Sequence, residues 1–79
     1  MPKYKDLRMD QKAYLIALGG KIKSLRKDLG LSQEEFAEQL GVNRGTIIRI
    51  ENGTQNSTIQ MLLSISEVLR IEIKDLVAV

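Results

Sequence analysis

Hydrophobic residues recur every three or four positions along most of the chain, the spacing at which side chains share one face of an α-helix. The first such segment carries the stripe Leu15, Leu18, Ile22, Leu25 and Leu29. Asp10 is a candidate N-cap for this helix, and Gly30 is a candidate left-handed residue after its end. We find neither a hairpin signal nor an internal repeat.

Further short helices follow, separated by glycines and capping residues. The run Ser32-Gln33-Glu34-Glu35 has the form of a capping box. Asn43 can cap a third helix over residues 44–52, Thr58 can cap a fourth, and a last turn lies near residues 72–78. The pattern therefore predicts an all-α, compact five-helix domain. The residues expected to face its core from the second helix onward are Phe36, Ala37, Leu40, Ile47, Ile50, Ile59, Leu62, Leu63, Ile65, Leu69, Ile73, Leu76 and Val77.

The second and third segments form the sequence pattern of a helix-turn-helix over about residues 33–52, because two short helices are joined by a few residues that include a glycine. We expect Ala37 to be small because the third helix crosses close over it. Gly41 lies at the turn, where we expect a positive φ that suits glycine. Five residues share one arc of about 140° opposite Ile47 and Ile50. They are Arg44, Gly45, Ile48, Arg49 and Asn52.

Charge is distributed unevenly, although the net charge is only +2. Residues 1–28 hold eight basic and three acidic side chains, whereas residues 29–79 hold four basic and seven acidic ones. Between residues 28 and 69 the only basic side chains are Arg44 and Arg49. A basic region on a small domain favours nucleic acid as a partner, but a solvated helix face would look the same.

The composition excludes several classes of function. The chain has no cysteine and no histidine, which excludes a disulfide scaffold and leaves almost no basis for a zinc site. The remaining acid–base candidates are carboxylates without a fixed spacing, so we expect no enzyme activity, no metal and no cofactor. The longest apolar run, Ala13 to Leu18, is too short for a membrane span or for a signal-peptide core of about 7–15 residues. We therefore expect a soluble, cytoplasmic protein.

The motifs "GLSQEEFA", "GV", "IIRIENG" and "LLSISEVL" resemble those of the Cro and phage-repressor (Xre-type) helix-turn-helix family, over about residues 18–77. The resemblance implies a lambda-repressor-like domain at residues 15–79, preceded by a basic arm and helix extension at residues 1–14. It also implies a transcriptional repressor whose third helix enters the major groove of double-stranded DNA, as a homodimer on a palindromic operator. The candidate DNA-binding residues are Gln33, Asn43, Arg44, Gly45, Thr46, Ile48, Arg49 and Asn52.

Most of these candidates have an alternative role. Arg44 and Arg49 suit guanine edges, but Arg44 could touch only phosphate and Arg49 could be a surface residue. Ile48 suits a thymine methyl group or a protein partner. Gln33 matches the family glutamine that meets a phosphate or braces the recognition helix. The remaining polar candidates are as suited to caps and turns as to phosphate: Asn43, Thr46 and Asn52.

Arg26 and Glu51 match the pair that, in phage repressors, bridges the first helix to the end of the third. The expected dimer surface is the C-terminal apolar set Ile71, Ile73, Leu76, Val77 and Val79, which we predict to exceed what one short helix buries on its own core. Residues 4–14 are the second candidate surface. The alternative function is an antitoxin or coactivator-like interaction module, with a toxin or other protein as its partner and DNA binding as a secondary activity.

Three features depart from the family pattern. The loop "TQNST" carries no lysine or arginine, so contacts to phosphate there must come from amides, hydroxyls and backbone. Arg70 stands where a glycine often ends the fourth helix, and Glu72 stands where a capping residue is common. The resemblance therefore leaves the geometry of the final helix open.

Overall fold

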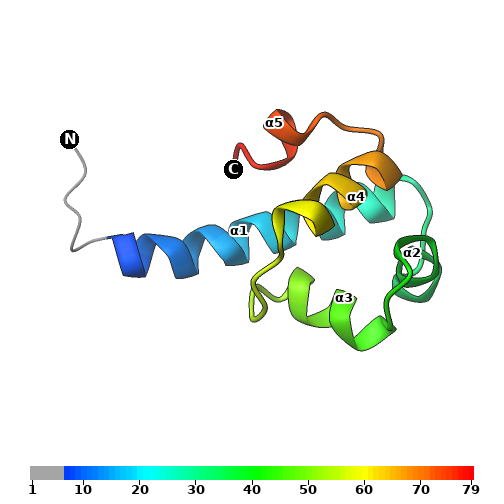
Figure 1. Ribbon diagram of the computed structural model, residues 1–79, viewed down its shortest axis with the longest axis horizontal. Helices are drawn as coiled ribbons and strands as arrows, with labels where there is room; N and C mark the ends of the chain where they lie inside the picture. Colours follow the sequence, from blue (N-terminus) through cyan, green and yellow to red (C-terminus); the bar gives the residue numbers. More distant parts are fainter. Residues whose placement is uncertain (1–6) are drawn as a thin grey trace.

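The computed structural model describes the backbone of residues 7–79 and the side chains of residues 11–79. This part of the chain holds five α-helices and no strand, which confirms the predicted all-α fold (Figure 1). The helices are α1 (Leu7–Asp28), α2 (Gln33–Leu40), α3 (Arg44–Glu51), α4 (Ile59–Leu69) and α5 (Ile73–Leu76).

The long helix α1 organises the domain, because α3, α4 and α5 all pack against it. The pair α2 and α3 lies on one side of α1 and α5 lies on the other, while the first turns of α1 extend beyond the other helices (Figure 1). In addition, α2 contacts α3 and α4, and α5 contacts α4. The helix-turn-helix is thus attached to the rest of the domain through both α1 and α4.

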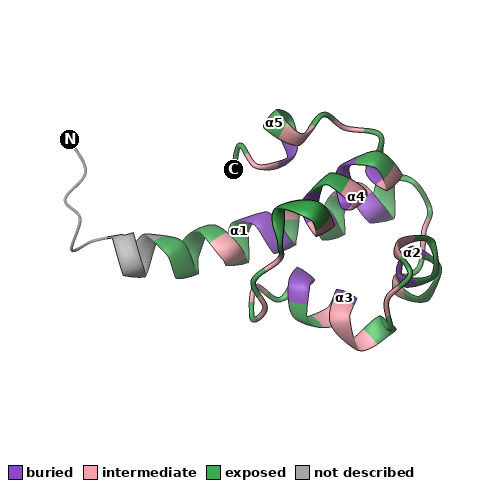
Figure 2. Cartoon of the chain, viewed as in Figure 1, coloured by how far each residue is buried: buried purple, intermediate pink, exposed green. Residues whose placement is uncertain are grey.

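Each of the five helices contributes one completely buried side chain to a single core. These are Ile22, Phe36, Ile47, Ile65 and Leu76, one from each helix in chain order. Figure 2 shows the buried positions on the inward faces of the helices. Burying a side chain of this kind contributes about 1.5–3 kcal/mol, so no helix of the five is dispensable for the core.

Two glycines allow α1 to lie in backbone contact with the end of α3. A Cβ added at Gly19 would lie 2.4 Å from the carbonyl oxygen of Ile50, and one added at Gly53 would lie 2.7 Å from Cα of Ile16. A side chain at either position would therefore force the two elements apart. At Gly20, by contrast, an added Cβ would meet nothing within 4 Å.

The helix-turn-helix begins with the capping box that the sequence predicts. The Ser32 hydroxyl accepts from the Glu35 amide at 3.0 Å, and the Glu35 carboxylate accepts from the Ser32 amide at 2.9 Å. Hydrogen bonds with Ser32 lower the pKa of the Glu35 carboxyl. The larger effect comes from the Ser32 amide and the smaller one from the Ser32 hydroxyl. Gly41 ends α2 with a φ of 71°, as expected for the turn.

Arg70 and Glu72, which depart from the family pattern, lie at the end of α4 and the start of α5. Arg70 takes the left-handed conformation itself, with a φ of 58°, and ends α4 where a glycine is more usual. Glu72 occupies the N-cap position of α5, but its side chain makes no capping hydrogen bond. A helix of four residues nevertheless forms, because Leu76 is buried in the core and α5 packs against α1 and α4.

The start of α1 differs from the sequence prediction. Asp10 lies inside the helix and is not its N-cap, because α1 already begins at Leu7. The expected arm is therefore helical from Leu7 onward, as leucine, arginine, methionine and glutamine all favour helix. The rest of the expected arm, residues 1–6, lies outside the described residues.

Three residues expected in the core are exposed instead. The exposed fractions are 41% for Leu29, 71% for Ile59 and 44% for Leu63. Leu29 follows the last residue of α1, so the helical spacing no longer determines its direction. Ile59 and Leu63 lie four positions apart on α4, beside the arc that faces the core. The apolar arc of α4 is therefore wider than the face that the described residues cover.

The C-terminal segment is also more firmly attached than expected. Leu76 is completely buried, and Ile71, Ile73 and Val77 pack against the core, so only Val79 of the expected dimer set is exposed. Tyr14 and Lys21 of α1 hold this segment by its backbone. The bonds run from the Tyr14 hydroxyl to the Val77 carbonyl at 2.5 Å, and from Lys21 Nζ to the Ala78 carbonyl at 2.9 Å and to the Asp75 carbonyl.

Candidate nucleic-acid interface

Helix α3 presents one polar face to solvent and one apolar face to the core. The side chains of Ile47, Ile50 and Glu51 are buried, whereas Arg44 and Arg49 are exposed on the opposite side. Of the other candidate residues in this region, Gly45, Thr46 and Ile48 are half-buried, and Asn43 and Asn52 are exposed. The two arginines and their neighbours thus form one continuous outward face.

The N-terminal end of this face is fixed by Asn43. Its side-chain oxygen accepts from the amide of Thr46 at 2.8 Å and from the Thr46 hydroxyl at 3.0 Å. This is the N-cap predicted for the third helix. Asn43 and Thr46 therefore act as structural residues in the isolated chain, and any contact with phosphate would come in addition to that role.

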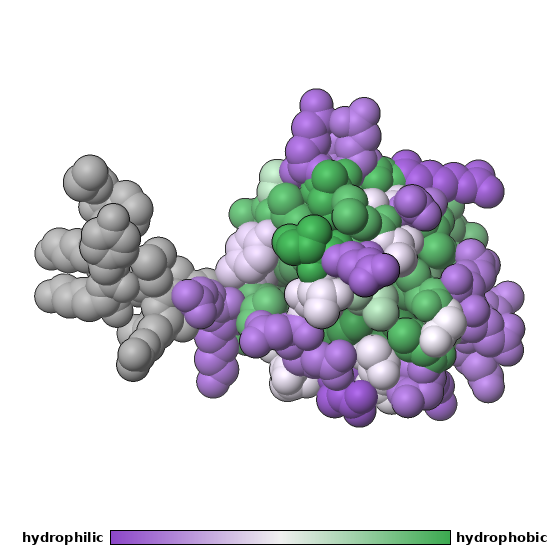
Figure 3. Space-filling model, in the orientation of Figure 1, coloured by the Kyte–Doolittle hydropathy of each residue, from purple (hydrophilic) through white to green (hydrophobic). Residues whose placement is uncertain are grey.

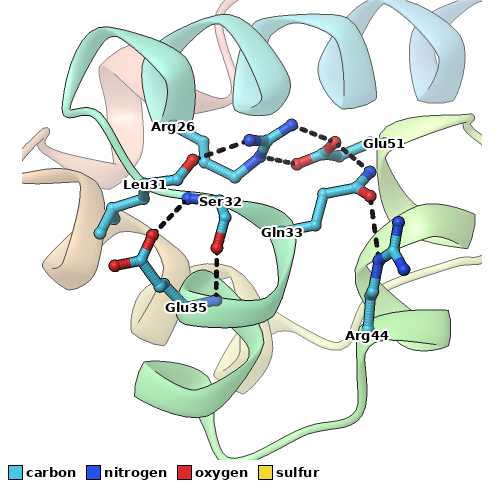
Figure 4. Close-up of polar contacts among 7 residues, drawn as sticks. All are labelled: Arg26, Leu31, Ser32, Gln33, Glu35, Arg44 and Glu51. Carbon is cyan, nitrogen blue, oxygen red and sulfur yellow. Dashed lines mark hydrogen bonds and ion pairs between the residues drawn. The ribbon is translucent and has the colours of Figure 1, made fainter.

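A buried ion pair joins α1 to the end of α3. Arg26 Nε lies 2.7 Å from Glu51 Oε2, and Arg26 Nη2 lies 3.0 Å from Glu51 Oε1, so the pairing is bidentate. The two side chains are only 6% and 1% exposed. Arg26 Nη1 also donates to the Leu31 carbonyl at 2.8 Å, which ties the turn before α2 into the same arrangement (Figure 4).

Gln33 links this buried pair to the exposed face. Its Nε2 donates to Glu51 Oε1 at 3.1 Å, while its Oε1 accepts from Arg44 Nε at 3.4 Å (Figure 4). The second distance is longer than the usual 2.7–3.2 Å range for an N–H···O bond, so Arg44 is held loosely. Gln33 thus bonds to Glu51 and makes only a weak contact with Arg44.

Arg49 has a hydrogen-bond partner, Gln55, that is closer to it than Gln33 is to Arg44 and that the sequence did not predict. Its Nε donates to Oε1 of Gln55 at 2.8 Å, and its Nη2 lies 3.4 Å from the Thr46 hydroxyl. Gln55 lies in the loop between α3 and α4, outside any helical spacing that would relate it to Arg49. The only signal in the sequence was the unusual loop "TQNST", which lacks basic residues but contains an amide side chain at this position.

The charge of the face follows from these contacts. The only acidic residue of α3 is Glu51, which is buried and paired with Arg26, so no carboxylate of α3 lies beside Arg44 and Arg49. The positive end of the helix dipole lies at the same N-terminus as Arg44. This arrangement attracts anions, and the planar guanidinium groups suit phosphate and guanine edges.

The described residues fit neither a metal ion nor a membrane span. No group of three or more acidic, cysteine or histidine side chains comes together in a way that could hold a metal ion. No helix among them has the length and apolar character needed to cross a membrane. Every buried side-chain nitrogen or oxygen in this part of the chain has a hydrogen-bond partner.

Known proteins resemble this chain over most of its length. A family model described as Helix-turn-helix matches residues 22–76. The control protein C.MunI from Mycoplasma sp is 42% identical over 62 residues, which are 77% of this chain and 84% of that protein.

Solved structures show the same similarity. The restriction-modification controller protein C.AhdI from Aeromonas hydrophila superposes with a TM-score of 0.79 at 33% identity, over 85% of this chain and 97% of that one. SinR, a master regulator for biofilm formation whose structure was solved in complex with DNA, has a TM-score of 0.70 at 38% identity, over 75% of this chain and 95% of that one. The chain belongs to the Xre-type helix-turn-helix family.

Proposed function

We propose that this protein is a sequence-specific DNA-binding regulator of transcription, acting as a repressor, that inserts α3 into the major groove as a homodimer on a palindromic operator. The observation that carries the proposal is the outward face of α3, where Arg44 and Arg49 stand without a neighbouring carboxylate of the same helix. Similarity to SinR, whose structure contains DNA, and to the control proteins C.AhdI and C.MunI supports it.

The dimensions of α3 suit this role. An α-helix with its side chains is about 10–12 Å across, which fits the major groove of about 12 Å width, and the eight residues of α3 extend about 12 Å along the helix axis at a rise of 1.5 Å per residue. Arg44 lies near one end of the face and Arg49 near the other, so the two side chains would meet different base pairs. Ile48 lies between them and would meet a thymine methyl group.

The supporting residues explain why α3 would keep its position against DNA. The Arg26–Glu51 pair and the backbone contact at Gly19 hold the end of α3 against α1. Gln33 joins α2 to the same pair. A rigid element loses less conformational freedom on binding than a mobile one, which favours affinity. Asn43, Thr46, Asn52 and Gln33 would contribute contacts to phosphates, and Gly45 would allow close approach to the bases.

Arg49→Ala is expected to weaken binding to the cognate operator by about 5- to 150-fold per half-site, which corresponds to about 1–3 kcal/mol. It should also relax the preference at one base pair in each half-site. The operator is first selected from a random duplex pool, and affinities are then measured by competition against all single-base variants at two salt concentrations. Lys74→Ala, which removes an exposed charge on α5, is the control and should leave the preference unchanged.

The same binding series separates base recognition by Arg49 from phosphate binding and from the absence of DNA binding. If Arg49→Ala weakens every operator variant equally and makes the log–log salt slope shallower by about 0.9 per contact, Arg49 binds phosphate and does not recognise sequence. Specificity would then come from Arg44, Ile48 or DNA shape. If the wild-type protein shows no salt-dependent binding to duplex DNA, the proposal fails in favour of a protein-interaction module.

Leu76 cannot belong to the expected dimer surface at the C-terminus, because its side chain is inside the core. Of the expected C-terminal apolar set only Val79 has an exposed side chain, and α4 adds the exposed apolar residues Ile59 and Leu63. Figure 3 shows hydrophobic side chains gathered over the region of α4, with polar side chains around them. We therefore place the dimer surface on the exposed face of α4 and the end of the chain.

Sedimentation at tens of micromolar protein should show a dimer for the wild type and a monomer for Leu63→Lys. A charge at Leu63 would have to be desolvated in the interface, which is costly. Leu29→Lys is a matched control, because Leu29 is 41% exposed, close to the 44% of Leu63, but lies at the end of α1. A monomeric wild type, with and without operator DNA, would exclude the dimer. Equal effects of both variants would exclude the proposed surface.

A further inference from the structure

We propose that Gln55 is a positioning residue for sequence recognition: its side-chain carbonyl holds Nε of Arg49 and so directs the two Nη groups of that arginine toward the bases. The inference rests on the proposed function of α3. It adds a residue that lies outside the helix-turn-helix and that helical spacing does not connect to Arg49.

The chemistry of a guanidinium group allows Nε to bond Gln55 while the Nη groups bond a base. A guanidinium group carries five N–H donors in one plane. The bond from Nε to Gln55 Oε1, at 2.8 Å, occupies one of them. The contact of Nη2 with the Thr46 hydroxyl, at 3.4 Å, is too long to compete strongly. The donors needed for a bidentate bond to guanine O6 and N7 therefore remain available, while the plane that contains them is oriented.

Gln55 is placed by a loop that is itself held in position. The amide of Thr54 donates to the Arg49 carbonyl at 2.9 Å, and the amide of Gly53 donates to the Ile50 carbonyl at 3.1 Å. Together with the positive φ of Gly53, this is the Schellman arrangement that ends a helix. Gly53 also lies against the backbone of α1 at Ile16. Gln55 follows two residues later and is half-buried.

The comparison with Arg44 shows why this contact matters. Both arginines of the outward face donate from Nε to a glutamine Oε1, but the distance is 2.8 Å to Gln55 and 3.4 Å to Gln33. Arg49 is thus oriented before DNA arrives, whereas Arg44 keeps more rotamer freedom to lose on binding. Of the two arginines, Arg49 should therefore contribute the sharper base preference.

The test combines Gln55→Met, which keeps the length of the side chain but removes the acceptor, with a double-mutant cycle against Arg49→Ala. Gln55→Met should weaken binding to the selected operator by about 2- to 10-fold per half-site. It should relax the preference at the same base pair as Arg49→Ala. In the Arg49→Ala background it should have no further effect, because Gln55 acts through Arg49.

Two further variants separate positioning from other roles. Gln55→Glu keeps an acceptor for Nε, so it should retain the base preference even though its charge weakens binding to all DNA. Gln39→Met, at an exposed glutamine of α2, should change neither affinity nor preference. In the DNA-free protein, the Nε–H signal of Arg49 in a ¹⁵N NMR spectrum should shift, and its hydrogen exchange should accelerate, in Gln55→Met but not in Gln39→Met.

Several results would overturn the inference. Losses that add in the double mutant, or that are equal for every operator variant, would mean that Gln55 contacts DNA by itself. Stronger binding by Gln55→Met would mean that the bond restrains Arg49 away from DNA. An unchanged Nε–H signal would mean that the bond is not populated. If the wild type shows no base preference at all, the proposed function fails, and the NMR result alone then decides whether Gln55 orients Arg49.

Discussion

Glu51→Ala is expected to lower the free energy of unfolding by about 3–5 kcal/mol, because it leaves the Arg26 guanidinium buried without its carboxylate partner. For 79 residues at about 0.05–0.15 kcal/mol each, the total stability is about 4–12 kcal/mol. The change would therefore remove a large part of it. Urea denaturation followed by circular dichroism measures the effect, provided that the slope with denaturant is the same in both proteins.

Glu34→Ala provides the matched control for this experiment. Glu34 is an exposed carboxylate in the first turn of α2, where the helix dipole makes it worth about 0.3–1 kcal/mol. The same chemical change should thus have a several-fold smaller effect when the carboxylate faces solvent. Equal denaturation midpoints for the two variants would show that the Arg26–Glu51 pair does not stabilise the junction of α1 and α3.

A double mutant extends the prediction to the pair as a whole. Arg26→Leu combined with Glu51→Leu removes both charges together and leaves neither one buried alone. It should therefore be less destabilised than Glu51→Ala, although Gln33 Nε2 loses its acceptor. If the double mutant is as unstable as the sum of the single changes, the two side chains do not depend on one another.

Gly19→Ala and Gly20→Ala are expected to change stability in opposite directions. Both glycines lie inside α1, where alanine is favoured over glycine by about 1 kcal/mol. At Gly19 the added methyl would lie 2.4 Å and 2.5 Å from the carbonyl oxygens of Ile50 and Glu51, so α3 must move. Overpacking of this kind costs about 1–3 kcal/mol, and a backbone obstacle places it at the upper end.

At Gly20 the methyl enters open space, and the variant should be more stable by about 0.4–1 kcal/mol. Thermal unfolding of the two variants beside the wild type checks both signs in one experiment. Because local helix propensity is the same for the two positions, the difference between the variants measures the contact between α1 and α3. A stabilised Gly19→Ala protein would mean that this contact is looser than the structure shows.

Some features of this structure could be predicted from the sequence, and others could not. The capping box at Ser32, the turn at Gly41 and the caps at Asn43 and Thr58 were all predicted, and each is present. They are local, since each depends on hydrogen bonds between residues a few positions apart. The outward arc of α3 was predicted for the same reason, because helical geometry alone determines which side chains share a face.

The position of Arg26 opposite Glu51 came from the family resemblance and not from any local pattern, because 25 residues separate the two. The resemblance could not supply Gln55, because the loop that carries it departs from the family pattern. Its contact with Arg49 follows from how Gly53 turns the chain against Ile16. Helical spacing puts Gly20 nearly opposite Ile22 on α1 and Gly19 beside the core face, but only the packing brings the backbone of α3 against Gly19.

By itself, the sequence determined the helix-turn-helix, the caps at Ser32, Asn43 and Thr58 and the polar face of α3, because propensity, hydrogen bonding and the 3.6-residue period act over a few residues. Only the tertiary structure decided which apolar side chains are covered. Leu76 is buried because α5 lies against α1 and α4, whereas Ile59 and Leu63 are exposed because none of the other helices among residues 7–79 covers that side of α4. Burial depends on which surfaces meet, and residues far apart in the chain determine that meeting.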